Sequence, residues 1–144
     1  MKPVAVALAI LVAIQFVPYG RHHSNPPVIQ EPKWDSAATR AIAQRACFDC
    51  HSNQTVWPEY ARVAPISWLL QADVEDGRAA LNFSEWQRPQ EHADEAAEVV
   101  RRNEMPLLLY RVMHSGGRLT DAERERLAQG LERTVAALGP GLVK

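Results

Sequence analysis

The pattern of apolar and polar residues along the chain predicts helices and no strand. Apolar side chains recur at the three- and four-residue spacing that places them on one face of a helix. The segments expected to be helical are residues 35–51, 66–81, 88–103, 106–114 and 120–138. The expected fold class is therefore all-α, a small helical domain preceded by an apolar N-terminal helix.

Polar residues mark the ends of several of these helices. Asp35 or Ser36 is the expected N-cap of the first. Thr120 and Glu123 have the spacing of a capping box ahead of the last helix, and the Gly-Pro pair at residues 139–140 is expected to end it. The apolar residues that repeat along this last helix are Leu127, Leu131, Val135 and Leu138.

The chain begins with a segment of the kind that directs export. Lys2 precedes an apolar run over residues 3–17 that only Gln15 interrupts. A positive residue followed by an apolar core is typical of an export signal. We expect an uncleaved signal anchor that tethers the protein to the inner membrane, or alternatively a cleaved signal peptide. In both cases the folded part lies in the periplasm.

This interpretation divides the chain into four parts. The parts are a signal anchor or signal peptide (1–20), a tether (21–34), one folded domain (35–139) and a short tail (140–144). The 144 residues carry a formal net charge of −1, so no broad electrostatic attraction to nucleic acid is expected.

The chain has two cysteines, Cys47 and Cys50, and His51 follows the second directly. In an exported protein such a pair can form a redox dithiol, half of a metal site, or thioether bonds to haem. A zinc site would need further soft ligands, and the sequence has no other cysteine. A thioredoxin-type pair would follow a strand, whereas the segment before Cys47 is predicted to be helical.

The histidine favours haem among these possibilities. In a CxxCH motif both thiols bond to haem and the histidine binds the iron. We therefore predict one covalently bound haem c on Cys47 and Cys50, with His51 as the proximal iron ligand. The second ring nitrogen of His51 should bind a backbone carbonyl, for which the loop over residues 58–65 is the expected source. The alternative is a disulfide beside a surface histidine.

A sixth iron ligand is expected on the other face of the haem. The candidates are Met105, Met113, His92, His114 and the pair His22 and His23. Met105 is favoured because Pro106 interrupts the helix there and lets the side chain leave the helical register. Met113 is expected to pack on a helix face, and His114 to cap that helix. His114 remains the alternative sixth ligand.

Three stretches carry a resemblance to a known family. They are "ACFDCHSNQTVWPEYARVAPISWLL", "GRAALNFSEW" and "NEMPLLLYRVMHSGGRLTDAER". From about residue 26 to residue 138 the chain resembles the haem-binding domain family of small exported bacterial monohaem c-type cytochromes. The resemblance implies covalent haem on Cys47 and Cys50, ligation by His51, and Met105 facing the iron. The family often has two prolines after this methionine, whereas here Leu107 follows Pro106.

The expected function is single-electron transfer and not catalysis. Ligation by histidine and methionine saturates the iron and raises its potential, so the haem would pass electrons without binding substrate. The expected partners are redox proteins that dock transiently, and the membrane through the N-terminal segment. The alternative is a haem sensor or a peroxidase-like enzyme with an open or displaceable sixth position, where His114 or Arg111 could act.

Overall fold

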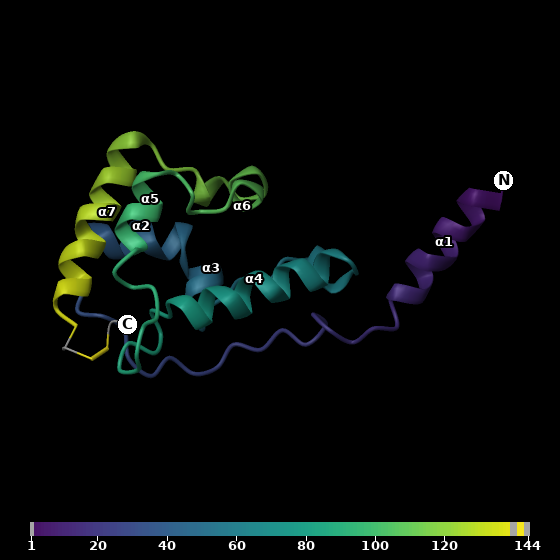
Figure 1. Ribbon diagram of the computed structural model, residues 1–144, viewed down its shortest axis with the longest axis horizontal. Helices are drawn as coiled ribbons and strands as arrows, with labels where there is room; N and C mark the ends of the chain where they lie inside the picture. Colours follow the sequence, from purple (N-terminus) through teal and green to yellow (C-terminus); the bar gives the residue numbers. More distant parts are fainter. Residues whose placement is uncertain (1, 139–140, 143–144) are drawn as a thin grey trace.

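The computed structural model describes residues 2–138 and 141–142, and most of them are helical (Figure 1). The α-helices are α1 (Lys2–Ile14), α2 (Ala37–Ala46), α3 (Phe48–His51), α4 (Ile66–Ala80), α5 (Ala96–Arg101), α6 (Leu108–Met113) and α7 (Asp121–Ala136). Two 3₁₀ turns, η1 (Glu59–Arg62) and η2 (Ser115–Gly117), complete the elements. The described residues contain no strand, which confirms the all-α prediction. The helix stop predicted at residues 139–140 lies outside the described residues, as does most of the predicted tail.

The helix ends follow local side-chain chemistry. Ser36 caps α2, because its hydroxyl accepts a 3.1 Å hydrogen bond from the amide of Thr39. The Asp35 carboxylate pairs with Arg133 of α7 at 2.8 Å. The predicted capping box of α7 is present, with the Thr120 and Glu123 side chains each bonded to the other's backbone amide.

Two predicted helices are shorter than expected. The first breaks at Cys47, which separates α2 from the single turn α3. The helix expected over residues 88–103 is reduced to α5, and the residues before it form turns. The buried side chain of Gln90 explains this, since its amide bonds to the backbone of Asn82, Glu85 and Arg88. Gln90 therefore holds a compact loop where the residue pattern alone suggested a helix.

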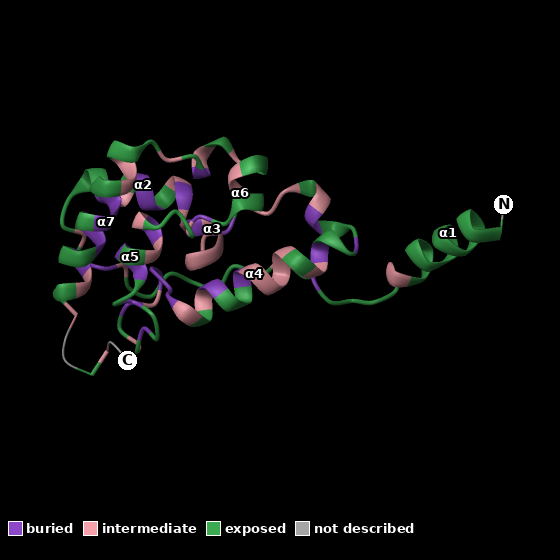
Figure 2. Ribbon diagram, turned by 45° about the horizontal axis from the view of Figure 1, so that its top comes forward, coloured by how far each residue is buried: buried purple, intermediate pink, exposed green. Residues whose placement is uncertain are grey.

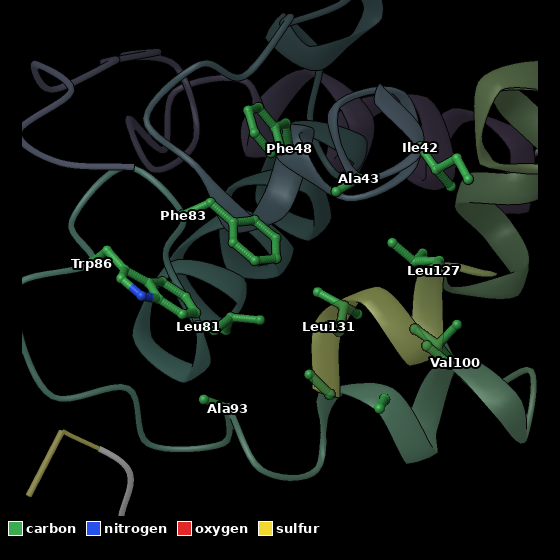
Figure 3. Packing of buried hydrophobic residues seen from close by; sticks show 13 residues of the cluster. Ile42, Ala43, Phe48, Leu81, Phe83, Trp86, Ala93, Val100, Leu127 and Leu131 are labelled. Atoms are coloured by element: carbon green, nitrogen blue, oxygen red, sulfur yellow. The ribbon is translucent and has the colours of Figure 1, made fainter. Parts of the chain in front are cut away.

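The core lies where α2, α5 and α7 pack together (Figures 1 and 2). A methyl group at Gly130 of α7 would lie 2.2 Å from the Thr39 hydroxyl of α2, so these helices approach closely only because this residue is glycine. Aromatic rings from the loop after α4 extend the core, and Figure 3 shows them opposite the leucines of α7. The buried cluster consists of Ile42, Ala43, Phe48, Leu81, Phe83, Trp86, Ala93, Ala96, Ala97, Val100, Leu127, Ala128 and Leu131.

The apolar N-terminal segment forms the 13-residue helix α1, which has no buried residue and projects away from the core (Figure 2), but the predicted anchor is not found. Among the described residues, no helix combines the length and the apolar character needed to cross a membrane. The stretch that follows α1 runs beside α4 (Figure 1). The Gln15 amide bonds to both backbone groups of Ala64, at 2.9 and 3.1 Å, and the His23 ring stacks on Trp57 at 4.2 Å. Residues 15–23 are therefore held against the domain.

Candidate functional site

Cys47 and Cys50 lie on one tight turn between α2 and α4. The amide of Cys47 closes α2 with a 2.8 Å bond to Ala43, and the carbonyl of Cys47 accepts a 2.9 Å bond from the His51 amide. Phe48, between the cysteines, is buried in the core cluster and anchors the turn. Both thiols are free and half-buried. The turn thus holds two thiols and an imidazole together at the edge of the core.

A glycine of α4 lets this helix approach the turn. A methyl group at Gly77 would lie 2.6 Å from the carbonyl oxygen of Cys50 and 3.0 Å from its Cβ. Such distances are closer than van der Waals contact, so no larger residue fits without a backbone shift. Gly77 therefore sets the spacing between α4 and the CxxCH turn. Sequence reasoning missed it, although it opens the "GRAALNFSEW" stretch.

The His51 ring is held by the residue that follows α4. Its Nδ1 lies 3.1 Å from the carbonyl oxygen of Leu81. Because a carbonyl only accepts, Nδ1 carries the proton, and Nε2 keeps the lone pair that can bind a metal. The sequence predicted a carbonyl from the loop over residues 58–65, and this was wrong. Burial lowers the pKa of His51, which keeps the ring neutral at pH 7.

The backbone after His51 is tied to α4 and to the loop that follows it. The carbonyl of His51 accepts a 2.8 Å bond from the Phe83 amide. The guanidinium of Arg78 donates to the Ser52 carbonyl at 2.8 Å and to the Thr55 hydroxyl at 3.0 Å. These bonds fix the chain on the C-terminal side of the motif. Neither Arg78 nor Phe83 could be recognised from sequence spacing, because both act across long stretches of chain.

A chain of contacts joins α6 to the CxxCH turn. Tyr110 donates a 2.7 Å hydrogen bond to Asp49, which lies between the two cysteines. The Tyr110 ring stacks on His114 at 4.4 Å, and the Nε2 of His114 lies 3.4 Å from the Tyr60 hydroxyl. Burial, together with the bond to Asp49, raises the pKa of Tyr110 well above its ordinary value. Tyr110 is therefore a neutral donor that positions α6 beside the motif.

His114 ends α6 as its C-cap, as predicted. Its Nδ1 is buried, and within the described part of the chain it has no hydrogen-bond partner. The stacking on Tyr110 places this imidazole on the side of α6 that faces the motif. His114 is thus well placed for the role of alternative ligand.

Met105 is held by the end of α5. Asn103 adopts the left-handed conformation, with φ at 60°, and turns the chain out of the helix. The amides of Glu104 and Met105 then both donate to the Val99 carbonyl, at 3.0 and 3.2 Å. The half-buried Met105 side chain packs against the same core cluster as Cys47. The predicted sixth ligand and one cysteine of the predicted attachment site therefore both contact the core cluster.

The remaining candidate ligands lie elsewhere. The prediction that Met113 packs is wrong, because α6 buries no residue and Met113 is 55% exposed. His92 is exposed and lies 3.7 Å from the carboxylate of Glu95. His23 is held in its stack on Trp57. Among the candidates, His114 is linked to the CxxCH turn through Tyr110 and Asp49, and Met105 packs against the core cluster that Cys47 also contacts.

Comparison with protein families gives one match. The model of the haem-binding domain family matches residues 9–133, which is most of the chain. The chain belongs to the haem-binding domain family. The resemblance seen in the sequence is therefore confirmed, and haem is the cofactor that membership supports. Comparisons with curated proteins and with solved structures gave no match.

The site residues fit the family's cofactor. A haem-binding domain with a CxxCH motif needs free thiols, a neutral histidine with an available nitrogen, and a fixed ring orientation. Cys47 and Cys50 have free thiols, and the Leu81 carbonyl fixes the His51 tautomer. The close approach of α4 at Gly77 supports the turn. The donor set therefore agrees with haem.

The thiols of this haem-binding domain are expected to react slowly once the chain is folded. Burial raises the pKa of Cys47 and Cys50 from 9.0 to about 12, and the carboxylates of Asp73 and Asp49 add to the effect at Cys50. Since the thiolate is the reactive form, the haem-free folded chain at pH 8 should react with a thiol reagent about a thousandfold more slowly than the denatured chain. Stopped-flow labelling, with circular dichroism to verify folding, measures this.

The raised pKa of the two thiols also predicts how the stability of the chain depends on pH. The folded chain keeps both thiols protonated at pH values where the unfolded chain loses these protons. The free energy of unfolding of the haem-free chain should therefore fall as the pH rises from about 9 toward about 12. Equal labelling rates in the folded and denatured chains would show that the thiols are not shielded.

Proposed function

We propose that this protein is a monohaem c-type cytochrome that transfers single electrons. Cys47 and Cys50 would hold one haem c covalently, and His51 and Met105 would bind its iron. The observation that carries the proposal is the CxxCH turn, in which the Nδ1 of His51 is engaged by Leu81 at 3.1 Å and Nε2 is left for iron. Family membership supports the cofactor.

Each residue has a defined role in this proposal. The two thiols hold the porphyrin, and the Leu81 carbonyl holds the imidazole in one tautomer and orientation. The Met105 thioether fills the sixth position and excludes substrate, so the protein is a carrier and not an enzyme. Haem, when bound, supplies the one-electron iron couple. The protein would hold the ligands in place. The core against which Cys47 and Met105 pack would shield one side of the haem from solvent.

The N-terminal segment and the net charge support a location and a class of partner. The exposed apolar side chains of α1, among them Leu8, Leu11 and Val12, support contact with a membrane by the N-terminal segment. Export to the periplasm agrees with the positive residue and apolar run at the N-terminus. We propose redox proteins as transient partners, and no nucleic acid, because the net charge is −1.

One observation supports a second candidate function. The His114 ring stacks on Tyr110, and its buried Nδ1 has no hydrogen-bond partner among the residues that the structure describes. In place of Met105, His114 could ligate the iron, which would give a bis-histidine carrier of lower potential. With an open or displaceable sixth position, His114 or Arg111 could instead serve as the polar group of a haem sensor or a peroxidase-like enzyme.

Absorption spectra of the protein and of Met105→Ala, made in a host that attaches haem covalently, test the proposal. The weak far-red iron–sulfur band should be present in the oxidised parent and absent from Met105→Ala. Met113→Ala is the matched control and should keep the band, because Met113 is exposed on α6. A denaturing gel should show haem remaining on the chain.

Other outcomes would overturn parts of the proposal. Loss of haem on the gel would remove covalent attachment. A parent without the band that binds carbon monoxide readily when reduced would favour the sensor or enzyme. A parent with neither the band nor carbon monoxide binding would favour His114, and His114→Ala should then open the sixth position.

A further inference from the structure

A hollow of about 330 Å³ lies between α6, the loop before it and the start of α7. Its apolar lining comes from Pro106, Leu108, Val112 and Leu119. Leu119 also packs against the core cluster, so the floor of the hollow is continuous with the core. A hollow of this size lies at the lower end of the range for small-molecule sites.

The hollow is separate from the haem motif. Tyr110 and His114 lie on the side of α6 that faces the CxxCH turn. Neither Tyr110 nor His114 lines the hollow, whereas Leu108, Arg111 and Val112 of the same helix do. Neither cysteine lines the hollow.

Three arginines and no acidic residue line the hollow: Arg111, Arg118 and Arg124. Arg124 forms an ion pair with Asp121 at 2.6 Å, which offsets one of the three charges. Among the described residues, Arg111 and Arg118 form no ion pair. Arg118 donates at 2.8 and 3.1 Å to the carbonyls of Arg111 and Val112. Two guanidinium groups are thus held in place with uncompensated charge.

The arginines also retain unused donor capacity. The Nε atoms of Arg111 and Arg124 are buried, and within the described residues they have no hydrogen-bond acceptor. A buried donor without an acceptor is costly, and a guanidinium suits the planar fork of a carboxylate. An anion in the hollow would supply the missing acceptors, while the apolar floor would take up a short hydrocarbon chain.

We propose that this hollow binds a small organic carboxylate. Its carboxylate lies among Arg111, Arg118 and Arg124, and its hydrocarbon chain packs on Leu108, Val112 and Leu119. This is a second binding site, distinct from the CxxCH turn, because neither cysteine nor His51 lines it. The ligand class follows from the combination of fixed positive charge and an apolar floor in a hollow of about 330 Å³.

Calorimetric titration of the full-length, haem-loaded protein with hexanoate tests the proposal. Hexanoate should bind, and acetate should bind at least about tenfold more weakly because it buries less hydrocarbon. Hexanol should not bind, because it lacks the charge. Arg111→Gln and Arg118→Gln should each weaken hexanoate binding about tenfold. Arg126→Gln is the matched control, since Arg126 is exposed on α7 and lies outside the hollow.

A further variant separates the two halves of the site. Leu108 is 68% exposed, so Leu108→Asn should leave thermal unfolding unchanged and should weaken hexanoate binding but not acetate binding. No binding of hexanoate, equal binding of acetate and hexanoate, or equal losses in Arg111→Gln and Arg126→Gln would each overturn the proposal. Equal binding of acetate would point instead to acidic side chains of a partner protein. None of these readouts depends on the identity of the sixth ligand.

Discussion

Phe83→Ala is expected to lower the free energy of unfolding by about 3–5 kcal/mol, enough to remove much of the stability of a domain of this size. The Phe83 side chain is 1% exposed. Its ring lies 5.0 Å from Trp34, 5.6 Å from Phe48 and 5.9 Å from Trp86, measured between centroids. Truncation to alanine would therefore leave a cavity at the centre of the aromatic part of the core (Figure 3).

The loss of stability in Phe83→Ala should extend from the core to the haem motif. The Phe83 amide bonds to the His51 carbonyl at 2.8 Å, so a shift of this backbone would disturb the histidine. Denaturant unfolding, followed by both tryptophan fluorescence and haem absorption, should show the two signals moving together to lower denaturant concentration. Phe83→Leu is the control and should lose less, roughly 1–2 kcal/mol, because it removes less of the buried side chain. A loss below 1 kcal/mol in Phe83→Ala would show that the cluster is not the core that stabilises the domain.

Gly77→Val is expected to separate α4 from the CxxCH turn. A Cβ at this position would lie 2.6 Å from the Cys50 carbonyl oxygen, and neither partner is the flexible end of a side chain. Overpacking against backbone should cost about 3 kcal/mol and move Leu81 away from His51. We therefore expect lower thermal stability and a smaller yield of chains carrying covalent haem.

Two variants make this prediction specific. Ala79→Val introduces the same side chain on the exposed side of α4 and should cost only about 0.5 kcal/mol, through helix propensity. Gly77→Ala should fall between the two, because alanine favours the helix but still meets Cys50. Thermal unfolding and haem content per chain measure both effects. If Gly77→Val matches Ala79→Val, α4 does not need glycine to support the motif.

The sequence predicted those features that depend on local chemistry. The all-α class, the capping box at Thr120 and Glu123 and the cap at His114 involve residues close together in the chain, and the structure has all three. The family resemblance rested on long stretches of residues, and the family comparison confirms it. The ligand roles of His51 and Met105 stay predictions that the spectra will test.

The features that the sequence did not predict depend on contacts across the chain. The Leu81 carbonyl reaches His51 only because Gly77 lets α4 pass close to the turn. The first half of the helix expected over residues 88–103 is absent because the Gln90 side chain bonds to the backbone of a loop. Met113 was expected to pack from its spacing on α6, yet helical spacing does not say whether another element covers that face. Periodicity identifies which residues share a helix face, and tertiary packing decides whether that face is buried.

The stretch between α1 and the haem motif limits how the domain can move. A flexible linker would let the domain sample a volume that grows with linker length. Here Gln15 is bonded to Ala64 and His23 is stacked on Trp57, so the stretch is fixed at two points and has little conformational freedom. A surface that receives α1 would therefore also set the distance and orientation of the haem motif. Partners on the same surface would meet the motif at an effective concentration determined by geometry and not by free diffusion.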